Sequence, residues 1–83
     1  MRHAQAGALD QLEGLLGDLR TMPGLTEKKR GIFYRGSQAF LHFHEDPTGL
    51  YADVRLDVDF ERMRVSSPNE QKSLLTRVRR ALG

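Results

Sequence analysis

The stretch Ala39-Phe40-Leu41-His42-Phe43-His44-Glu45-Asp46 alternates with a period of two. That is the period of a β-strand, in which successive side chains point to opposite faces of a sheet. Leu41 and Phe43 therefore share one face of the predicted strand. The other face carries an aromatic ring and two imidazoles, those of Phe40, His42 and His44. Only this stretch aligns side chains able to do chemistry, so we look for the function on its second face.

Turn residues bracket this strand and extend it into a meander. Gly36-Ser37 before it fits a two-residue hairpin turn with positive φ at the glycine. Asp46-Pro47-Thr48-Gly49 after it fits a turn in which Asp comes first, Pro fixes φ and Gly comes last. Together with the alternating runs on either side, these turns predict four strands, over residues 28–35, 38–44, 50–56 and 60–65.

A helix is predicted at each end of the meander. Residues 4–22 carry leucines at spacings of three and four, which form one apolar stripe, and Pro23-Gly24 ends this helix. The second helix begins at Ser67 as N-cap, with Pro68 in the first helical position and Glu70 completing a capping box. The order α-β-β-β-β-α predicts an α+β fold. We expect a two-layer sandwich in which both helices cover one face of a four-stranded antiparallel meander.

Composition narrows the class of protein. Eighty-three residues predict a single domain over residues 1–83. The absence of cysteine excludes a disulfide scaffold, a thiolate metal site and a cysteine nucleophile. Because the N-terminus lacks the apolar core of a signal peptide, and no apolar run is long enough to cross a bilayer, we expect a cytoplasmic protein with no membrane partner.

The net charge of +2 is distributed in blocks of alternating sign along the chain. In a compact fold such blocks mostly neutralise one another through ion pairs between elements, which is the interpretation that we favour. The alternative is a basic patch that binds an anionic partner.

The face of the sheet opposite the helices is the predicted binding surface. If Leu41, Phe43, Val54 and Met63 point toward the helices, the open face presents aromatic, imidazole and guanidinium groups. The candidate binding residues on it are Phe40, His42, His44, Tyr51, Arg55, Arg62 and Arg64.

Three partners suit this face, and another protein or a second copy of the chain is the one we expect, because Tyr, Phe, Arg and His are enriched in interface cores. One alternative is single-stranded nucleic acid, since aromatic rings among arginines on an open sheet stack on bases and contact phosphates. The other is a metal ion held by His42 and His44, which lie at i and i+2 on one side of a strand. A carboxylate would come from Asp53, Glu45 or Asp46.

An enzymatic function is not predicted. The serines have turn and capping positions, and none lies in a Gly-x-Ser-x-Gly context. No glycine-rich phosphate loop precedes a helix, and no pair of acids is set in apolar surroundings that would separate their pKa values. We therefore predict a non-enzymatic protein that needs no cofactor.

Three segments resemble small bacterial domains of the family labelled "luciferase domain": Pro23-Gly24-Leu25-Thr26-Glu27, the strand 39–46, and Gly49-Leu50-Tyr51-Ala52-Asp53-Val54. A more distant resemblance is to the YjbR-like domains. These begin with a helix, a Pro-Gly turn and a hairpin with a central aromatic strand, and they are described as DNA-binding-like. After Leu56 this chain departs from the YjbR pattern. The resemblances imply a bacterial origin and an α+β fold, and they assign no catalytic residue.

Overall fold

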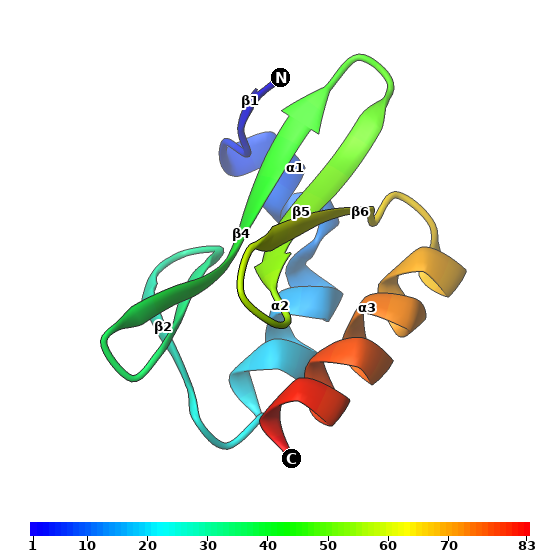
Figure 1. Cartoon of the computed structure of the whole chain (residues 1–83). Coiled ribbons are helices and arrows are strands. Elements are labelled where there is room, and N and C mark those ends of the chain that lie inside the picture. The colour runs from blue at the N-terminus through cyan, green and yellow to red at the C-terminus, as the bar shows by residue number, and fades with distance from the viewer.

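The computed structural model describes residues 1–83 and contains a six-stranded antiparallel sheet with helices on one side (Figure 1). In chain order the elements are β1 Arg2–His3, α1 Ala6–Gln11, α2 Glu13–Arg20, β2 Leu25–Lys29, β3 Ile32–Arg35, β4 Gln38–Asp46, β5 Gly49–Arg55, β6 Phe60–Arg64 and α3 Pro68–Leu82. The predicted α+β class, with antiparallel strands and helices at both ends, is confirmed. No helix is long and apolar enough to span a membrane.

The predicted number of strands is wrong. Strands β2 to β6 follow one another in a meander, so the predicted strand over residues 28–35 is in fact a hairpin that turns at Arg30-Gly31. Gly31 has φ of 81°, and a Cβ added there would lie 2.7 Å from the Leu9 side chain. Strand β1, which was not predicted, pairs with the part of β4 that lies beyond the end of its pairing with β3. In that pairing His3 lies opposite His44.

The predicted N-terminal helix is two short helices, α1 and α2, which meet at Leu12. Leu12 departs from helical geometry, with φ of −96° and ψ of 5°, and its side chain is fully buried. Three glycines, Gly7, Gly14 and Gly17, lie in this segment, and each lowers helix stability by up to about 1 kcal/mol relative to Ala. Leucines from both helices still join one core, so the predicted apolar stripe is confirmed although the helix is broken.

The covered face of the sheet packs on the helices through one cluster of 16 buried apolar residues. Figure 1 shows α1 and α2 running behind β4 and β5, with α3 beside β6. Leu41 lies opposite Val54 across β4 and β5, and all three predicted inward residues of these strands, Leu41, Phe43 and Val54, are buried. Met63 is partly buried against the same core. The predicted inward face is therefore confirmed.

Phe40 is the one candidate binding residue that lies in the core. Its side chain is 2% exposed, so the prediction that it faces outward is wrong. The cause is a β-bulge: Tyr34 pairs with Ala39 and Phe33 with Leu41, which leaves Phe40 as an extra residue in β4. The extra residue interrupts the alternation, so Phe40 and Leu41 both reach the core.

The alternating charge blocks pair across elements, as predicted. Arg20 of α2 bonds to the carboxylate of Glu27 in β2, and Arg30 bonds to Glu13 of α2 at 2.8 Å. Arg77 of α3 pairs with a glutamate on β6. Except for the partly buried Glu27, these side chains are exposed, and exposed pairs contribute little to stability.

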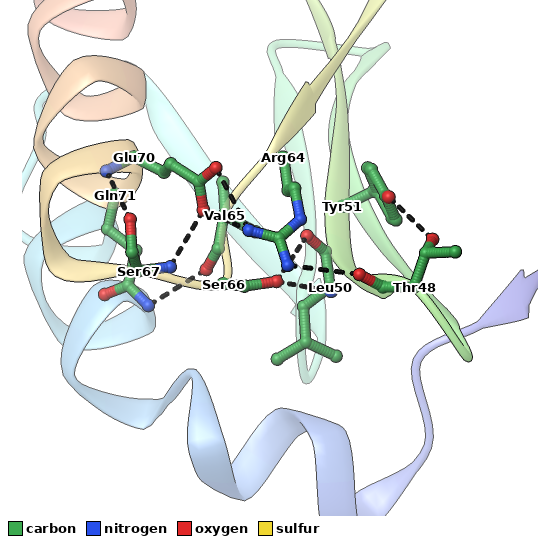
Figure 2. Close-up of polar contacts among 9 residues, drawn as sticks. All are labelled: Thr48, Leu50, Tyr51, Arg64, Val65, Ser66, Ser67, Glu70 and Gln71. Atoms are coloured by element: carbon green, nitrogen blue, oxygen red, sulfur yellow. Dashed lines mark hydrogen bonds and ion pairs between the residues drawn. The ribbon is translucent and has the colours of Figure 1, made fainter.

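Polar contacts tie the turn after β4 to the start of α3 (Figure 2). Arg64 on β6 donates from Nη1 to the carboxylate of Glu70 at 3.2 Å and from Nη2 to the carbonyl of Thr48 at 3.1 Å. Glu70 also accepts from the backbone N–H of Ser67 at 2.9 Å, and the Ser67 hydroxyl accepts from the backbone N–H of Glu70. This reciprocal pair confirms the predicted capping box.

The position of Gly49, next to these contacts, requires glycine. The predicted turn is present, but Gly49 has φ of 144°, which only glycine adopts readily. A Cβ there would lie 2.5 Å from Oγ of Ser66 and 2.9 Å from Nη2 of Arg64. The Ser66 hydroxyl is itself fixed, because it accepts from the backbone N–H of Leu50 at 2.8 Å. We name this set the Arg64 network: Thr48, Gly49, Leu50, Arg64, Ser66, Ser67 and Glu70.

Candidate metal centre

Two adjacent strands bring two histidines and an aspartate together on the open face of the sheet. His42 and His44 are two residues apart on β4, and Asp53 of β5 lies directly opposite His42. The bulge at Phe40 precedes these positions, so the alternation beyond it sends Phe43 into the core and both imidazoles outward. We name His42, His44 and Asp53 the His–Asp cluster.

The ligand atoms of the His–Asp cluster converge. All three lie within 4.8 Å of one another. Asp53 Oδ2 is 3.1 Å from Nε2 of His44 and 3.5 Å from Nε2 of His42. The three side chains are only 13–23% exposed, yet none of them lines a cavity of the molecule. The cluster is thus a shallow site on the open sheet face.

Nε2 of His44 is buried and has no hydrogen-bond partner. Asp53 Oδ2 is close to it at 3.1 Å, but this contact does not follow the hydrogen-bond direction of the ring. A hydrogen bond needs a favourable direction as well as a short distance, so this contact does not satisfy the nitrogen. A buried polar atom without a partner costs about 1–3 kcal/mol, so this nitrogen is a candidate ligand atom.

Arg62 holds the carboxylate of the His–Asp cluster from the other side. It donates from Nε to Oδ1 of Asp53 at 2.7 Å and from Nη2 to Oδ2 at 2.8 Å. These bonds from Arg62 lower the pKa of Asp53, which therefore carries its negative charge at neutral pH. Burial is the main reason that the pKa of His42 is also lowered, so this imidazole is neutral there.

Two further aromatic side chains border the cluster. The His3 ring of β1 lies 4.7 Å from that of His44 and 5.6 Å from that of His42, between ring centroids. On the other side, the Phe60 ring of β6 is 5.2 Å from the His42 ring. The Arg55 guanidinium lies over the Phe60 ring, 4.4 Å from its centroid. Sequence reasoning missed both residues. The alternation of β6 could have placed Phe60 beside Arg62, whereas His3 arrives by a pairing that no local pattern reveals.

Of the remaining predicted site residues, Phe40 lies in the core, whereas Tyr51, Arg55 and Arg64 lie on the open face outside the cluster. Arg55 donates to the carbonyls of Ala39 and Val58, and Arg64 belongs to the Arg64 network. The hydroxyl of Tyr51 bonds to that of Thr48 at 2.7 Å. Of the seven predicted residues, the structure thus brings only His42 and His44 into the cluster, with Arg62 supporting it.

The fold and the site define a small α+β domain with a histidine–aspartate cluster on its open sheet face. Comparison of the chain with protein-family models, with curated proteins and with solved structures gives no match. The resemblance to the "luciferase domain" and YjbR-like families therefore stays a prediction, and the function must be argued from geometry.

Proposed function

We propose that the protein binds a divalent transition metal ion of the zinc type through His42, His44 and Asp53. The observation that supports this proposal is the convergence of two imidazole nitrogens and a carboxylate oxygen within 4.8 Å on an accessible face. One of these nitrogens, Nε2 of His44, is buried and has no other partner.

The spacing of the ligand atoms suits a tetrahedral ion. Zinc binds imidazole nitrogen and carboxylate oxygen at about 2.0–2.2 Å, so two ligand atoms on a tetrahedral zinc lie roughly 3.3–3.6 Å apart. The distance from Asp53 Oδ2 to His42, 3.5 Å, lies in that range, and the distance to His44, 3.1 Å, is slightly below it. An ion can therefore enter with small movements of these side chains.

The ligand types favour one class of metal. Imidazole suits zinc, copper, iron and nickel, whereas magnesium and calcium prefer sets made of oxygen alone. A chain without cysteine offers no thiolate for copper(I) or for an iron–sulfur cluster. Two imidazoles and one carboxylate therefore fit zinc or a neighbouring divalent ion best.

Arg62 has two opposing effects on such an ion. Its bond to Oδ1 orients the carboxylate and leaves Oδ2 directed at the histidines, as partners of metal ligands commonly do. Its positive charge repels a cation, and its second bond, to Oδ2, must open when the ion binds. Because the Arg62 side chain is 49% exposed, water screens much of the repulsion. We therefore expect that Arg62 increases metal affinity more by orienting the Asp53 carboxylate than it decreases affinity by repelling the ion. Some repulsion nevertheless remains.

The proposal is tested by titrating zinc into the chain, without a histidine tag, and measuring binding by calorimetry. We expect one zinc ion per chain, with affinity reduced at least about tenfold in Asp53→Asn and in His44→Ala. Asp57→Asn is the matched control, since it removes an exposed carboxylate outside the cluster and should bind zinc as the unaltered chain does. Equal affinity in Asp53→Asn and Asp57→Asn would exclude the proposed site.

Protein interaction on the same face is a second candidate function. It is supported by two exposed apolar side chains at one end of the face, Val58 at 73% and Phe60 at 37% exposure. The double variant Val58→Asp and Phe60→Asp should abolish any self-association seen by sedimentation velocity as the concentration of the chain is raised. A chain that is monomeric throughout would argue against a homodimer. Nucleic-acid binding stays a prediction with less support. The three guanidinium groups of the face already have protein partners and are therefore less available to phosphates.

A further inference from the structure

We infer that His3 is the fourth ligand of the ion held by the His–Asp cluster, so that metal binding fastens β1 to the sheet. This inference rests on the proposed metal site and adds a ligand and a conformational consequence to it. His3 lies on a separate segment of the chain from the other ligands, which makes the two ideas separately testable.

The separations of the three imidazole rings support this assignment. A ring centroid lies about 1.1 Å beyond its ligating nitrogen, so two imidazoles on one tetrahedral zinc have centroids roughly 5.2 Å apart, from the usual Zn–N length. The observed separations are 4.7 Å for His3 and His44, 4.9 Å for His42 and His44, and 5.6 Å for His3 and His42. All three pairs thus already stand at about the spacing of a shared ion.

For His3 to join the other ligands, the orientation of its ring has to change. The three atoms that converge within 4.8 Å belong to His42, His44 and Asp53, so the ring of His3 must turn for its nitrogen to join them. His3 is exposed, and no hydrogen bond of its side chain holds the ring in place. Rotation about its side-chain bonds therefore meets little resistance.

The segment that carries His3 is lightly attached without an ion. β1 has two residues, both exposed, and its backbone pairs only with β4. Its other attachments are two ion pairs, of Arg2 with Glu45 at 2.7 Å and of the Met1 amine with Asp46 at 3.5 Å, and two bonds from the backbone N–H groups that follow it. Ala4 donates to the carbonyl of Phe43 at 3.0 Å, and Gln5 donates to the carboxylate of Glu45 at 2.8 Å. Short, exposed strands of this kind open readily. A coordinate bond from His3 would add a further attachment at the centre of the segment.

A fourth protein ligand also determines the kind of site. Zinc sites with three protein ligands keep a position for water and are typical of catalysis, whereas sites with four protein ligands are closed. Coordination by His3 fills that position. The metal site is then a structural site, and its occupancy is coupled to the attachment of β1 to the sheet.

The experiment compares zinc binding by the full chain without a histidine tag, by His3→Ala and by the control Arg2→Ala. The control weakens the attachment of β1 but keeps every imidazole. We expect His3→Ala to lose at least about tenfold in zinc affinity and Arg2→Ala to lose much less. In parallel, zinc should slow hydrogen exchange at the backbone N–H of Ala4 in the unaltered chain and in Arg2→Ala, but not in His3→Ala.

The outcomes separate the two ideas. If the unaltered chain binds no zinc, the proposed metal site fails and the role of His3 fails with it. If His3→Ala binds zinc as tightly as the unaltered chain, with the same protection of Ala4, the role of His3 is overturned while the site of the other three ligands stands. An equal loss in Arg2→Ala and His3→Ala would also overturn it, because attachment of β1 rather than the imidazole would then explain the loss.

Discussion

Two arginines on β6, Arg62 and Arg64, each hold a carboxylate, but the regions around them differ. In the Arg64 network the guanidinium joins Glu70 and the Thr48 carbonyl, Glu70 also caps α3, and Ser66 bonds to the backbone at Leu50 (Figure 2). Around Arg62 the carboxylate of Asp53 is equally well held, yet the neighbouring Nε2 of His44 is buried without a partner.

The difference separates a structural polar region from a candidate binding region. A hydrogen-bond network with every member satisfied adds rigidity, and it leaves no atom free for a ligand. A network with one unsatisfied buried member is less stable than it need be, and such an arrangement is typical of functional sites. The guanidinium–carboxylate pair alone would not have distinguished the two regions.

The largest effect is expected from breaking the Arg64 network at Gly49. Gly49→Ala places a Cβ 2.5 Å from Oγ of Ser66 and forces a residue other than glycine to φ of 144°. We expect the free energy of unfolding to fall by about 1–3 kcal/mol, measured by urea denaturation. Gly36→Ala is the control, since Gly36 also has positive φ but nothing lies within 4 Å of its added Cβ. An equal loss in both variants would show that the contacts with Ser66 and Arg64 do not matter.

The next effect should have the opposite sign. His44→Phe keeps a planar ring but removes the unpartnered nitrogen, so the free energy of unfolding should stay constant or rise by up to about 1 kcal/mol. Zinc binding should be lost. Ser66→Ala, which removes the partner of a backbone N–H, should instead lower stability in the same urea experiment. A clear loss of stability in His44→Phe would mean that Nε2 is satisfied, and the contrast between the two regions would disappear.

A smaller difference is expected between Arg62→Gln and Arg64→Gln. Both arginines are about half exposed, so neither change should alter stability greatly. Arg62→Gln removes a positive charge beside the metal site while keeping a donor for Asp53, and it should raise zinc affinity a few-fold. Arg64→Gln should leave the affinity unchanged. Equal responses in calorimetry would show that Arg62 is no closer to the ion than Arg64 is.

The smallest expected effect is a difference between the two regions in how they change stability with pH. Burial lowers the pKa of His42 from 6.5, and backbone and side-chain hydrogen bonds lower the pKa of Glu70 from 4.5. A group with a lowered folded-state pKa gives stability that is present above its unfolded pKa and is lost as pH falls through the folded value. Urea midpoints should thus decline slightly just below pH 6.5 and again below pH 4.5, where Glu13, Glu27 and Glu45, whose pKa values are also lowered, add to the effect of Glu70. Only the first decline should vanish in His42→Phe.

Much of the fold could be predicted from the sequence because its signals are local. The capping box at Ser67 and the turn at residues 46–49 depend on residues within a few positions of one another, and both are present. The hairpin within residues 25–35 was missed because the alternation is read equally well as one strand through Arg30. In the structure, the antiparallel pairing of β2 with β3 and the positive φ of Gly31 show that the chain turns there.

The candidate site was predicted only as far as strand geometry extends. The i, i+2 spacing puts His42 and His44 on one face, and Asp53 on the next strand was foreseeable as a carboxylate. Phe40 was misplaced because the sequence carries no sign of the extra residue in β4. His3 was missed because its position depends on a pairing between segments about 40 residues apart, which only the assembled sheet determines.

The bulge at Phe40 also bears on where the chain can change in length. It divides β4 into two stretches whose alternation is independent, one paired with β3 and the other carrying His42 and His44 against β5. Removing one residue at the bulge would restore regular pairing with β3 and leave the two histidines in place. Removing one residue between 42 and 46 would instead reverse the faces of the strand beyond that point. Deletions and insertions on the β3 side therefore keep the metal ligands on the open face, although deletion of Phe40 itself would remove a buried core side chain.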